Sequence, residues 1–374
     1  MNRSLKRQAR LPLVLLLVLI SAGCATRVRL DTPATPASRM PVPQVPVAPP
    51  VAEPSSATEV YSVDLGSTQV KDMVELVPPQ ELEFLRSWVS AYSRLYEVAG
   101  NLMIRNVQSC PNNARRILGF TAKNRYSYTQ RYSDAASAAL GLGERLQVFE
   151  VISQGGAHSA GIRKGDILLE INGQPLPAGA EAEREAAILV GAETRGKEQV
   201  DVTLSRQDQE MSLTVPLTEA CAFGIELGNS NAIASYSDGY RVMVTRGMLD
   251  FVQSDEELAF VIAGEFARNL STKQDTRAMA AIIDRLRSIG SVTDMDAAVM
   301  ALKPYSAEED IKADQLALQM LARSRYKVLA YRDFLKRLSE QDAANQPGGY
   351  NWLHPQLARR LAAIEKSAIS TGRR

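Results

Sequence analysis

The chain has 374 residues, and its 43 lysines and arginines nearly balance its 42 aspartates and glutamates. This length allows two or three domains, and a hydrophobic content of 45% is ample for a buried core. The near-zero net charge argues against a surface for nucleic acid, so we expect no nucleic-acid partner.

The N-terminus has the pattern of an export signal. Basic residues are followed by the apolar run Leu11–Ile20 and by small residues before Cys24. The run is too short to span a bilayer. Small residues before a cysteine resemble a bacterial lipobox, which implies a signal peptide over 1–23 and a lipid on Cys24. Because Ala25 follows rather than Asp, the resemblance implies the outer membrane, facing the periplasm. The alternative is an ordinary signal peptide with an incidental cysteine.

A proline-rich stretch comes next. Eight prolines lie within Asp31–Ala57 among Ala, Val, Ser and Thr, without helical or strand periodicity. Such segments stay extended and semi-rigid, so we expect 24–58 to be a tether. Beyond it, Pro79–Asn106 carries an apolar stripe at helical spacing behind two prolines, which predicts a packed helix within 59–108.

Residues 109–220 differ in pattern from the rest of the chain. The segment Gln147–Leu176 resembles the GSPAxxAGLxxGDxILxxNG signature of bacterial PDZ modules. A helix at Glu183–Val190 and strands at Val200–Ser205 and Glu210–Val215 complete the expected β-rich domain. We therefore expect an inserted PDZ-like domain.

The resemblance also implies a ligand site. A PDZ loop binds a C-terminal carboxylate with backbone N–H groups, next to a strand to which a peptide can add. The sequence Ile117-Leu118-Gly119-Phe120 resembles that loop, and Gly141–Gly143 is a weaker candidate. Protein C-termini are the expected partners. His158 replaces a proline of the signature, and we expect it in a surface turn rather than as a ligand.

Two cysteines remain after Cys24. Cys110 and Cys221 lie at the two ends of the expected insertion. In an oxidising compartment such a pair predicts a disulfide, and the ends of an inserted domain must lie close together. The alternative is two unpaired buried cysteines.

A central helix is predicted at Ser254–Lys273. Its apolar residues recur at helical spacing, and carboxylates fill its first turn, as the helix dipole favours. In its middle stands Gly264-Glu265-Phe266-Ala267-Arg268. A zinc peptidase would have H-E-x-x-H at these positions, two histidines one turn apart with a general-base glutamate.

DEELAFVIAGEFARN resembles the DELAAVLGHELAHV helix of the HtpX/BepA/CAAX-protease family of zinc metallopeptidases (gluzincins). Three more blocks follow the family's order: Asn231–Leu249, Tyr305–Arg323 and the pair His354-Pro355. The resemblance implies a peptidase-like domain over 221–374, with the helix in 59–108 as its first helix. For the whole chain it implies an α+β fold in which a mostly helical domain with a small sheet is interrupted by the PDZ-like domain. The alternative is that Ser254–Lys273 is an ordinary amphipathic helix that is unrelated to this family.

The family's metal ligands are missing. Gly264 and Arg268 stand at the histidine positions, and Asp310 stands where the family has its third ligand, a glutamate. Glycine has no side chain, and arginine has five donors and no acceptor. The family's general base persists as Glu265 and its second-sphere aspartate as Asp314.

A catalytic zinc site needs three protein ligands and an open position. The whole chain has only two histidines, His158 and His354, so we expect no metal and no cofactor. Zinc would be needed only if the domain were active.

We hypothesise that Arg268 replaces zinc as a structural counter-ion. It would point at the former metal position, with Glu265, Asp310 and Asp314 around it, because a guanidinium pairs well with carboxylates. His354 either precedes a helix that starts at Pro355 or lines the former metal cavity.

Two strands are predicted on either side of a turn at Ser237-Asp238-Gly239. In active relatives the edge strand of this sheet receives the substrate backbone, and we expect that edge to stay available.

The sequence thus predicts an envelope lipoprotein whose PDZ module persists and whose peptidase-like domain is a pseudopeptidase that binds or regulates protein substrates. One alternative is an active membrane-anchored metalloendopeptidase in envelope protein quality control. Another is a purely structural envelope protein.

Overall fold

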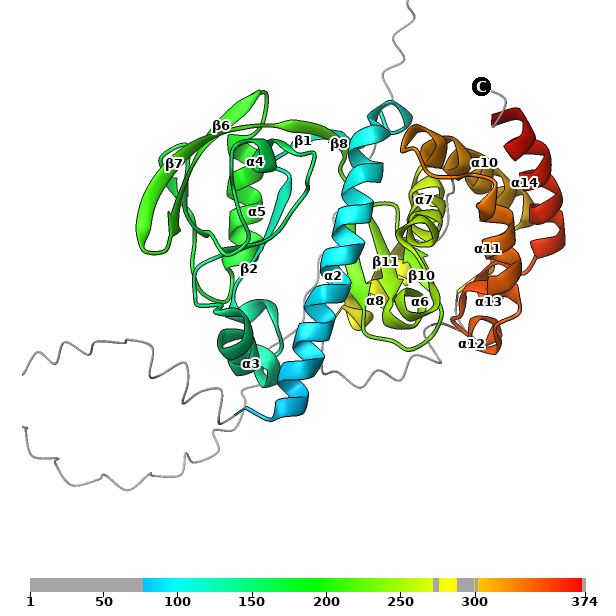
Figure 1. Cartoon of the computed structure of the whole chain (residues 1–374), viewed down its shortest axis with the longest axis horizontal. Coiled ribbons are helices and arrows are strands. Elements are labelled where there is room, and N and C mark those ends of the chain that lie inside the picture. Colours follow the sequence, from blue (N-terminus) through cyan, green and yellow to red (C-terminus); the bar gives the residue numbers. More distant parts are fainter. Residues whose placement is uncertain (1–76, 272–275, 288–298, 300–301, 372–374) are drawn as a thin grey trace, which may run out of the picture. The chain divides into compact units, whose positions relative to one another are not determined.

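The computed structural model describes residues 77–271, 276–287, 299 and 302–371, all within one compact unit (Figure 1). The predicted signal peptide, Cys24 and the tether lie outside the described residues. Among the residues described, no helix is both long enough and apolar enough to cross a membrane.

Helix α2 (Pro79–Arg105), cyan in Figure 1, forms where the apolar stripe predicts it. Proline occupies its first turn, where a missing N–H costs nothing. Its buried face belongs to the main hydrophobic core and includes Leu85, Leu95 and Leu102. The stripe therefore serves packing, as the sequence predicts.

The inserted domain is joined to the rest by a two-stranded neck. Strand β1 (Ala114–Ile117) pairs antiparallel with β8 (Thr218–Cys221). A disulfide joins Cys110 to Cys221, with a Cα–Cα distance of 5.8 Å, which confirms the predicted bridge. Because it closes a loop of 111 residues, it stabilises the fold by about 4 to 5 kcal/mol in the chain-entropy model.

A sheet of the order β2-β3-β4-β6-β7 forms the inserted domain, with β5 paired to β4. Its strands are β2 (Phe120–Lys123), β3 (Gln147–Val151), β4 (Ile167–Ile171), β5 (Gln174–Pro175), β6 (Gln199–Arg206) and β7 (Gln209–Pro216). Its helices are η2 (Arg125–Ser127), α3 (Gln130–Leu140), α4 (Gly156–Ser159) and α5 (Ala182–Glu193). The domain has its own apolar core, and η2 and α3 account for the long interval between Phe120 and Gln147.

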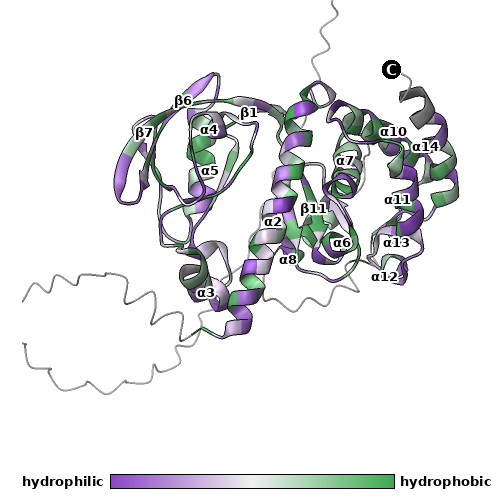
Figure 2. Ribbon diagram, in the orientation of Figure 1, coloured by the Kyte–Doolittle hydropathy of each residue, from purple (hydrophilic) through white to green (hydrophobic). Residues whose placement is uncertain are grey.

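The C-terminal domain surrounds a three-stranded sheet of the order β10-β11-β9. The strands are β9 (Gly224–Gly228), β10 (Ser235–Ser237) and β11 (Arg241–Thr245). The helices are α6 (Arg246–Phe251), α7 (Asp255–Ser271), α8 (Thr276–Leu286), α10 (Ala307–Arg323), α11 (Ala330–Ser339), α12 (Asp342–Asn345), α13 (Tyr350–Leu353) and α14 (Leu357–Thr371), and η1 (Val107–Ser109) follows α2. Strand β11 is coloured as hydrophobic in Figure 2, in keeping with its central position. The α+β prediction is confirmed.

One expectation about this sheet is wrong. Strand β10 lies at its edge, but Ser235, Tyr236 and Ser237 are all buried. The Tyr236 hydroxyl also donates a hydrogen bond to the carbonyl of Gly348, at 2.7 Å. An extended peptide therefore cannot pair with this edge unless the covering residues move away.

Candidate functional site

Helix α7 carries the altered peptidase motif deep in the C-terminal domain. Its apolar positions pack into the core, and the polar residues Glu265 and Arg268 are each only 1% exposed. Helix α10 begins at Ser306, whose hydroxyl accepts the Glu309 N–H while the Glu309 carboxylate accepts the Ser306 N–H. This capping box sets the helix start, and Asp310 and Asp314 follow one turn apart on the buried side.

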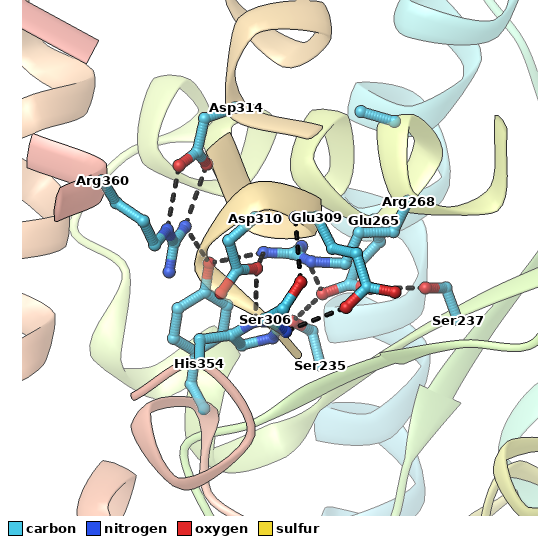
Figure 3. A network of polar contacts seen from close by, with 12 residues as sticks. Ser235, Ser237, Glu265, Arg268, Ser306, Glu309, Asp310, Asp314, His354 and Arg360 are labelled. Carbon is cyan, nitrogen blue, oxygen red and sulfur yellow. Dashed lines mark hydrogen bonds and ion pairs between the residues drawn. The ribbon is translucent and has the colours of Figure 1, made fainter. Parts of the chain in front are cut away.

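Arg268 is the centre of a buried polar network (Figure 3). Its Nη1 donates to Glu265 Oε1 at 3.0 Å, and its Nη2 lies 3.5 Å from Asp310 Oδ1. The same Nη2 donates to the Tyr350 hydroxyl at 3.0 Å. The guanidinium is thus held between two helices and the C-terminal segment.

Glu265 is also bound from the sheet. Ser235 Oγ donates to one carboxylate oxygen at 2.8 Å and Ser237 Oγ to the other at 2.7 Å. With Arg268, both oxygens of Glu265 therefore accept hydrogen bonds. The alternating Ser-Tyr-Ser of β10 places both hydroxyls on one face of the strand.

Asp314 departs from the predicted arrangement, because it pairs with Arg360 and not with Arg268. Arg360 Nε and Nη2 donate to its two oxygens at 2.8 and 2.9 Å, and the Tyr331 hydroxyl donates at 2.8 Å. Arg360 Nη2 also donates to the Tyr350 hydroxyl at 3.0 Å, so this hydroxyl joins the two guanidinium groups.

Arg360 was absent from the predicted site. A signal existed, since Leu357, Arg360, Leu361 and Ile364 follow i, i+3, i+4, i+7 spacing, which puts the arginine on the apolar face of α14. A fully buried cation there requires an acid, and Asp314 is that acid.

His354 belongs to the same network. Its Nδ1 lies 2.7 Å from Asp310 Oδ1, and its ring stacks on Tyr305 at 4.8 Å between centroids. Helix α14 begins at Leu357, so the expectation of a helix start at Pro355 is wrong. His158 is exposed on α4, in keeping with the expected surface position.

The charges of the network are set by its burial and its pairing. Burial would lower the pKa of Arg268, but Glu265, Tyr350 and Asp310 raise it, so Arg268 stays a cation. Burial would raise the pKa of Asp310, yet His354, Arg360 and Arg268 hold it below its usual value. Burial and the charge of Arg268 lower the pKa of His354.

A second candidate site is an apolar pocket of about 250 Å³ in the inserted domain. It is lined by Leu118, Phe120, Ala122, Leu146, Leu168, Ile171, Leu176, Glu183, Ala186, Ala187, Val190 and Val202. These residues include one face of α5 and the strand β2, which is an edge of its sheet. We refer to this pocket as the β2–α5 groove.

The predicted carboxylate loop lies at the start of this groove. Ile117 ends β1, Gly119 has a φ of +88°, and Leu118 and Phe120 line the pocket. A side chain at position 119 would be strained by the positive φ and would bring its Cβ within 3.3 Å of the Gly155 backbone. Gly141 instead ends α3 in a left-handed conformation, and Gly141–Gly143 does not line the groove.

Residues 198–368 match the model of peptidase family M48. We refer to this matched part of the chain as the M48 domain. Residues 113–204 match the model of the PDZ domain, which confirms the predicted insertion in front of the M48 domain. The finer domain boundaries stay predictions.

Comparison with curated proteins finds no similar protein. Among solved structures, the HtrA3 PDZ domain bound to a phage-derived ligand (FGRWV) is 18% identical, with 28% of this chain and 88% of that chain covered and a TM-score of 0.21. The HtrA-type protease AlgW with a decapeptide is 24% identical, with 28% and 30% covered and a TM-score of 0.22. The serine endoprotease from Yersinia pestis is 22% identical, with 29% and 30% covered and a TM-score of 0.19.

The M48 domain implies zinc, but the residues at its centre do not fit the ion. No cluster of three His, Cys, Asp or Glu in the described part of the chain is placed to hold a metal. A Cβ added at Gly264 would lie 3.1 Å from Arg268 Nη1, so the guanidinium would be in tight contact with any side chain at that position. The cavity beside Arg268 measures about 20 Å³, room for about one water.

Proposed function

We propose that this chain is an envelope lipoprotein that binds or regulates protein substrates through its PDZ domain, and that its M48 domain no longer cleaves peptides. The observation that carries the proposal is Arg268, a fully buried cation bound to Glu265 at the centre of the M48 domain. A permanent positive charge there opposes a second cation electrostatically.

The retained Glu265 supports the same conclusion. A general base needs a free lone pair within reach of the attacking water. Here Ser235, Ser237 and Arg268 donate three hydrogen bonds to the carboxylate, which take most of its roughly four lone pairs. Removing Arg268 without another cation in its place would leave Glu265 buried and unpaired, which costs roughly 3 to 5 kcal/mol.

The PDZ domain supports the binding half of the proposal. The β2–α5 groove is apolar and lies beside an edge strand, as strand addition of a peptide requires. A protein C-terminus with an apolar last residue is the ligand that these walls favour. In this proposal the tether and a lipid on Cys24 hold the domain at the periplasmic face of the outer membrane.

The decisive experiment measures metal content and proteolysis together. We expect purified protein dialysed against zinc to contain well below one zinc per chain, and casein to stay intact with or without chelator. Stoichiometric zinc with chelator-sensitive cleavage would instead establish the rival function, an active metalloendopeptidase.

Two further measurements test the peptide-binding and lipid-anchor parts of the proposal. An array of C-terminal peptides should yield apolar-ended ligands, and an array without a binder would favour the purely structural alternative. Metabolic labelling with a radioactive fatty acid should mark the native chain and not the Cys24→Ala variant. Labelling that survives this substitution would contradict the anchor.

A further inference from the structure

A larger cavity adjoins the β2–α5 groove. It measures about 890 Å³ and shares Leu118, Phe120, Ala187 and Val190 with the groove. Its opposite wall comes from outside the PDZ domain: Tyr92, Tyr96 and Met103 of α2, and residues 222–226, which end in the first half of β9. A peptide in the groove therefore has the M48 domain on its other side.

Contacts between α2 and β3 hold this wall in place. Gly100 of α2 lies so close to Ile152 that an added Cβ would come within 2.7 Å of the Ile152 side chain. Ser93 of α2 donates a hydrogen bond to Glu150 of β3, which also pairs with Lys164 at 2.5 Å. Helix α2, which supplies part of the opposite wall, thus packs directly on the PDZ domain.

Glu226 of β9 is the charged group on this wall. It is half-buried and lines the 890 Å³ cavity as well as two smaller neighbours of about 300 and 50 Å³. Among the described residues, no hydrogen bond or ion pair involves its carboxylate. Burial raises the pKa of Glu226 above the usual value, and the charges of Lys123, Arg287 and Arg241 offset only part of this effect.

Two of the nearby cations, Lys123 and Arg241, are held by other acids. Lys123 pairs with Glu183 at 3.3 Å. Arg241 pairs with Asp238 at 2.8 Å and with Asp284 at 2.7 Å. Arg287 is exposed and lines the two smaller cavities. Glu226 is therefore available to a basic group that arrives with a ligand.

The position of that group along the ligand follows from strand geometry. A peptide that adds to β2 antiparallel places its carboxylate at Gly119 and runs past Lys123. Four residues of strand span about 13 Å at about 3.3 Å per residue. Lys123 and Glu226 line the same two smaller cavities, so the residue beside Glu226 lies about three to five positions before the last one.

We propose that Glu226 of the M48 domain determines specificity for the PDZ ligand by binding a lysine or arginine three to five positions before an apolar C-terminal residue. The inference rests on the proposed peptide-binding function. It gives the degenerate peptidase domain a direct part in recognition, as the second wall of one composite site.

The test uses the full mature chain and fluorescent ten-residue peptides ending in Val, Leu or Phe. Each peptide carries Lys, Ala or Glu at one of the positions three to five before the end. We expect the best Lys peptide to bind about fivefold more tightly than its Ala counterpart, as for a partly buried ion pair. In Glu226→Gln this ratio should fall below twofold, and in Glu226→Lys the Glu peptide should become the tightest binder.

Two variants serve as controls. Glu219→Gln changes an exposed acid that lines none of these cavities, and it should keep the native preference. Ala187→Trp fills the groove and should weaken every peptide. Binding that ignores the charge at position 226 overturns this inference and leaves the PDZ function standing. If no apolar-ended peptide binds the native chain, the PDZ function fails, and this inference with it.

Discussion

The PDZ groove and the centre of the M48 domain differ in the polarity of the side chains that line them. The groove has mostly apolar walls around about 250 Å³, so it stays open without leaving polar groups unsatisfied. The M48 centre is built from charged side chains that are almost fully buried, with about 20 Å³ left beside Arg268. Buried charges require partners, and the partners fill the space in which a metal and a substrate would meet.

Under the proposed function, the groove binds peptides while the M48 centre is structural. The guanidinium of Arg268 pairs with acids of α7 and α10, and it must be enclosed to be paired. The groove needs no such enclosure. The predictions below test whether the two sites are independent in this way.

The largest effect is expected for Arg268→Ala. Removing the guanidinium leaves Glu265 buried without its cation, so the free energy of unfolding should fall by about 3 to 5 kcal/mol in urea titrations. Peptide affinity of the folded fraction should stay unchanged.

Arg94→Ala is the matched control. Arg94 pairs with Asp255 at the surface, where an ion pair contributes at most about 1 kcal/mol. Equal losses of unfolding free energy in the two variants would mean that Arg268 contributes no more to stability than a surface ion pair.

The second-largest effect is expected for acidification, which should lower the free energy of unfolding. The pKa of His354 is lowered in the folded state, so below about pH 6.5 the unfolded chain binds a proton that the folded chain resists. Stability is therefore full above pH 6.5 and declines as the pH falls, by up to about 2 kcal/mol between pH 7 and 5. Urea titrations of His354→Gln should show little of this decline, whereas exposed His158→Gln should keep it. An unchanged pH dependence in His354→Gln would contradict the assignment.

Filling the groove should change binding and leave stability alone. Ala187 is an exposed residue of α5 that lines the groove, and Ala187→Trp should lower peptide affinity at least tenfold, about 1.4 kcal/mol. Its neighbour Ile188 is 65% exposed and does not line the groove, so Ile188→Trp should bind normally. A shift of the urea midpoint in Ala187→Trp alone would link the groove to the fold.

The smallest effect compares two helical glycines. In Gly264→Ala the new methyl meets Arg268 Nη1 at 3.1 Å, and we expect a net loss of about 1 kcal/mol after the gain in helix propensity. In Gly191→Ala nothing lies within 4 Å, so the same change should stabilise by about 0.5 to 1 kcal/mol. Stabilisation in both variants would show that Arg268 can move away freely.

Much of this architecture could be read from local patterns. Helical spacing gave α2 and α7, the Gly119 loop followed from its motif, and the positions of Cys110 and Cys221 predicted their disulfide. Each of these features depends on neighbours in sequence or on a short motif, so a single sequence contains the information.

The ion pairing could not be read in this way. The sequence placed Glu265, Asp310 and Asp314 around Arg268, but Asp314 binds Arg360, which is 46 residues away. Tyr350 joins the two guanidinium groups, and Ser235 and Ser237 bind Glu265 from the sheet. Which acid meets which base depends on how helices pack, and a sequence pattern does not encode that.

The sequence by itself determined that no histidine pair stands in the M48 helix and that a PDZ domain precedes it. Both are statements about which residue types stand at which positions, so the order of residues decides them. Only the tertiary structure decided that the guanidinium of Arg268 is buried between acids, that β10 is covered, and that Glu226 of β9 lines the cavity next to the PDZ groove. Burial and electrostatic pairing arise from contacts between distant segments, so they exist only once the chain has folded.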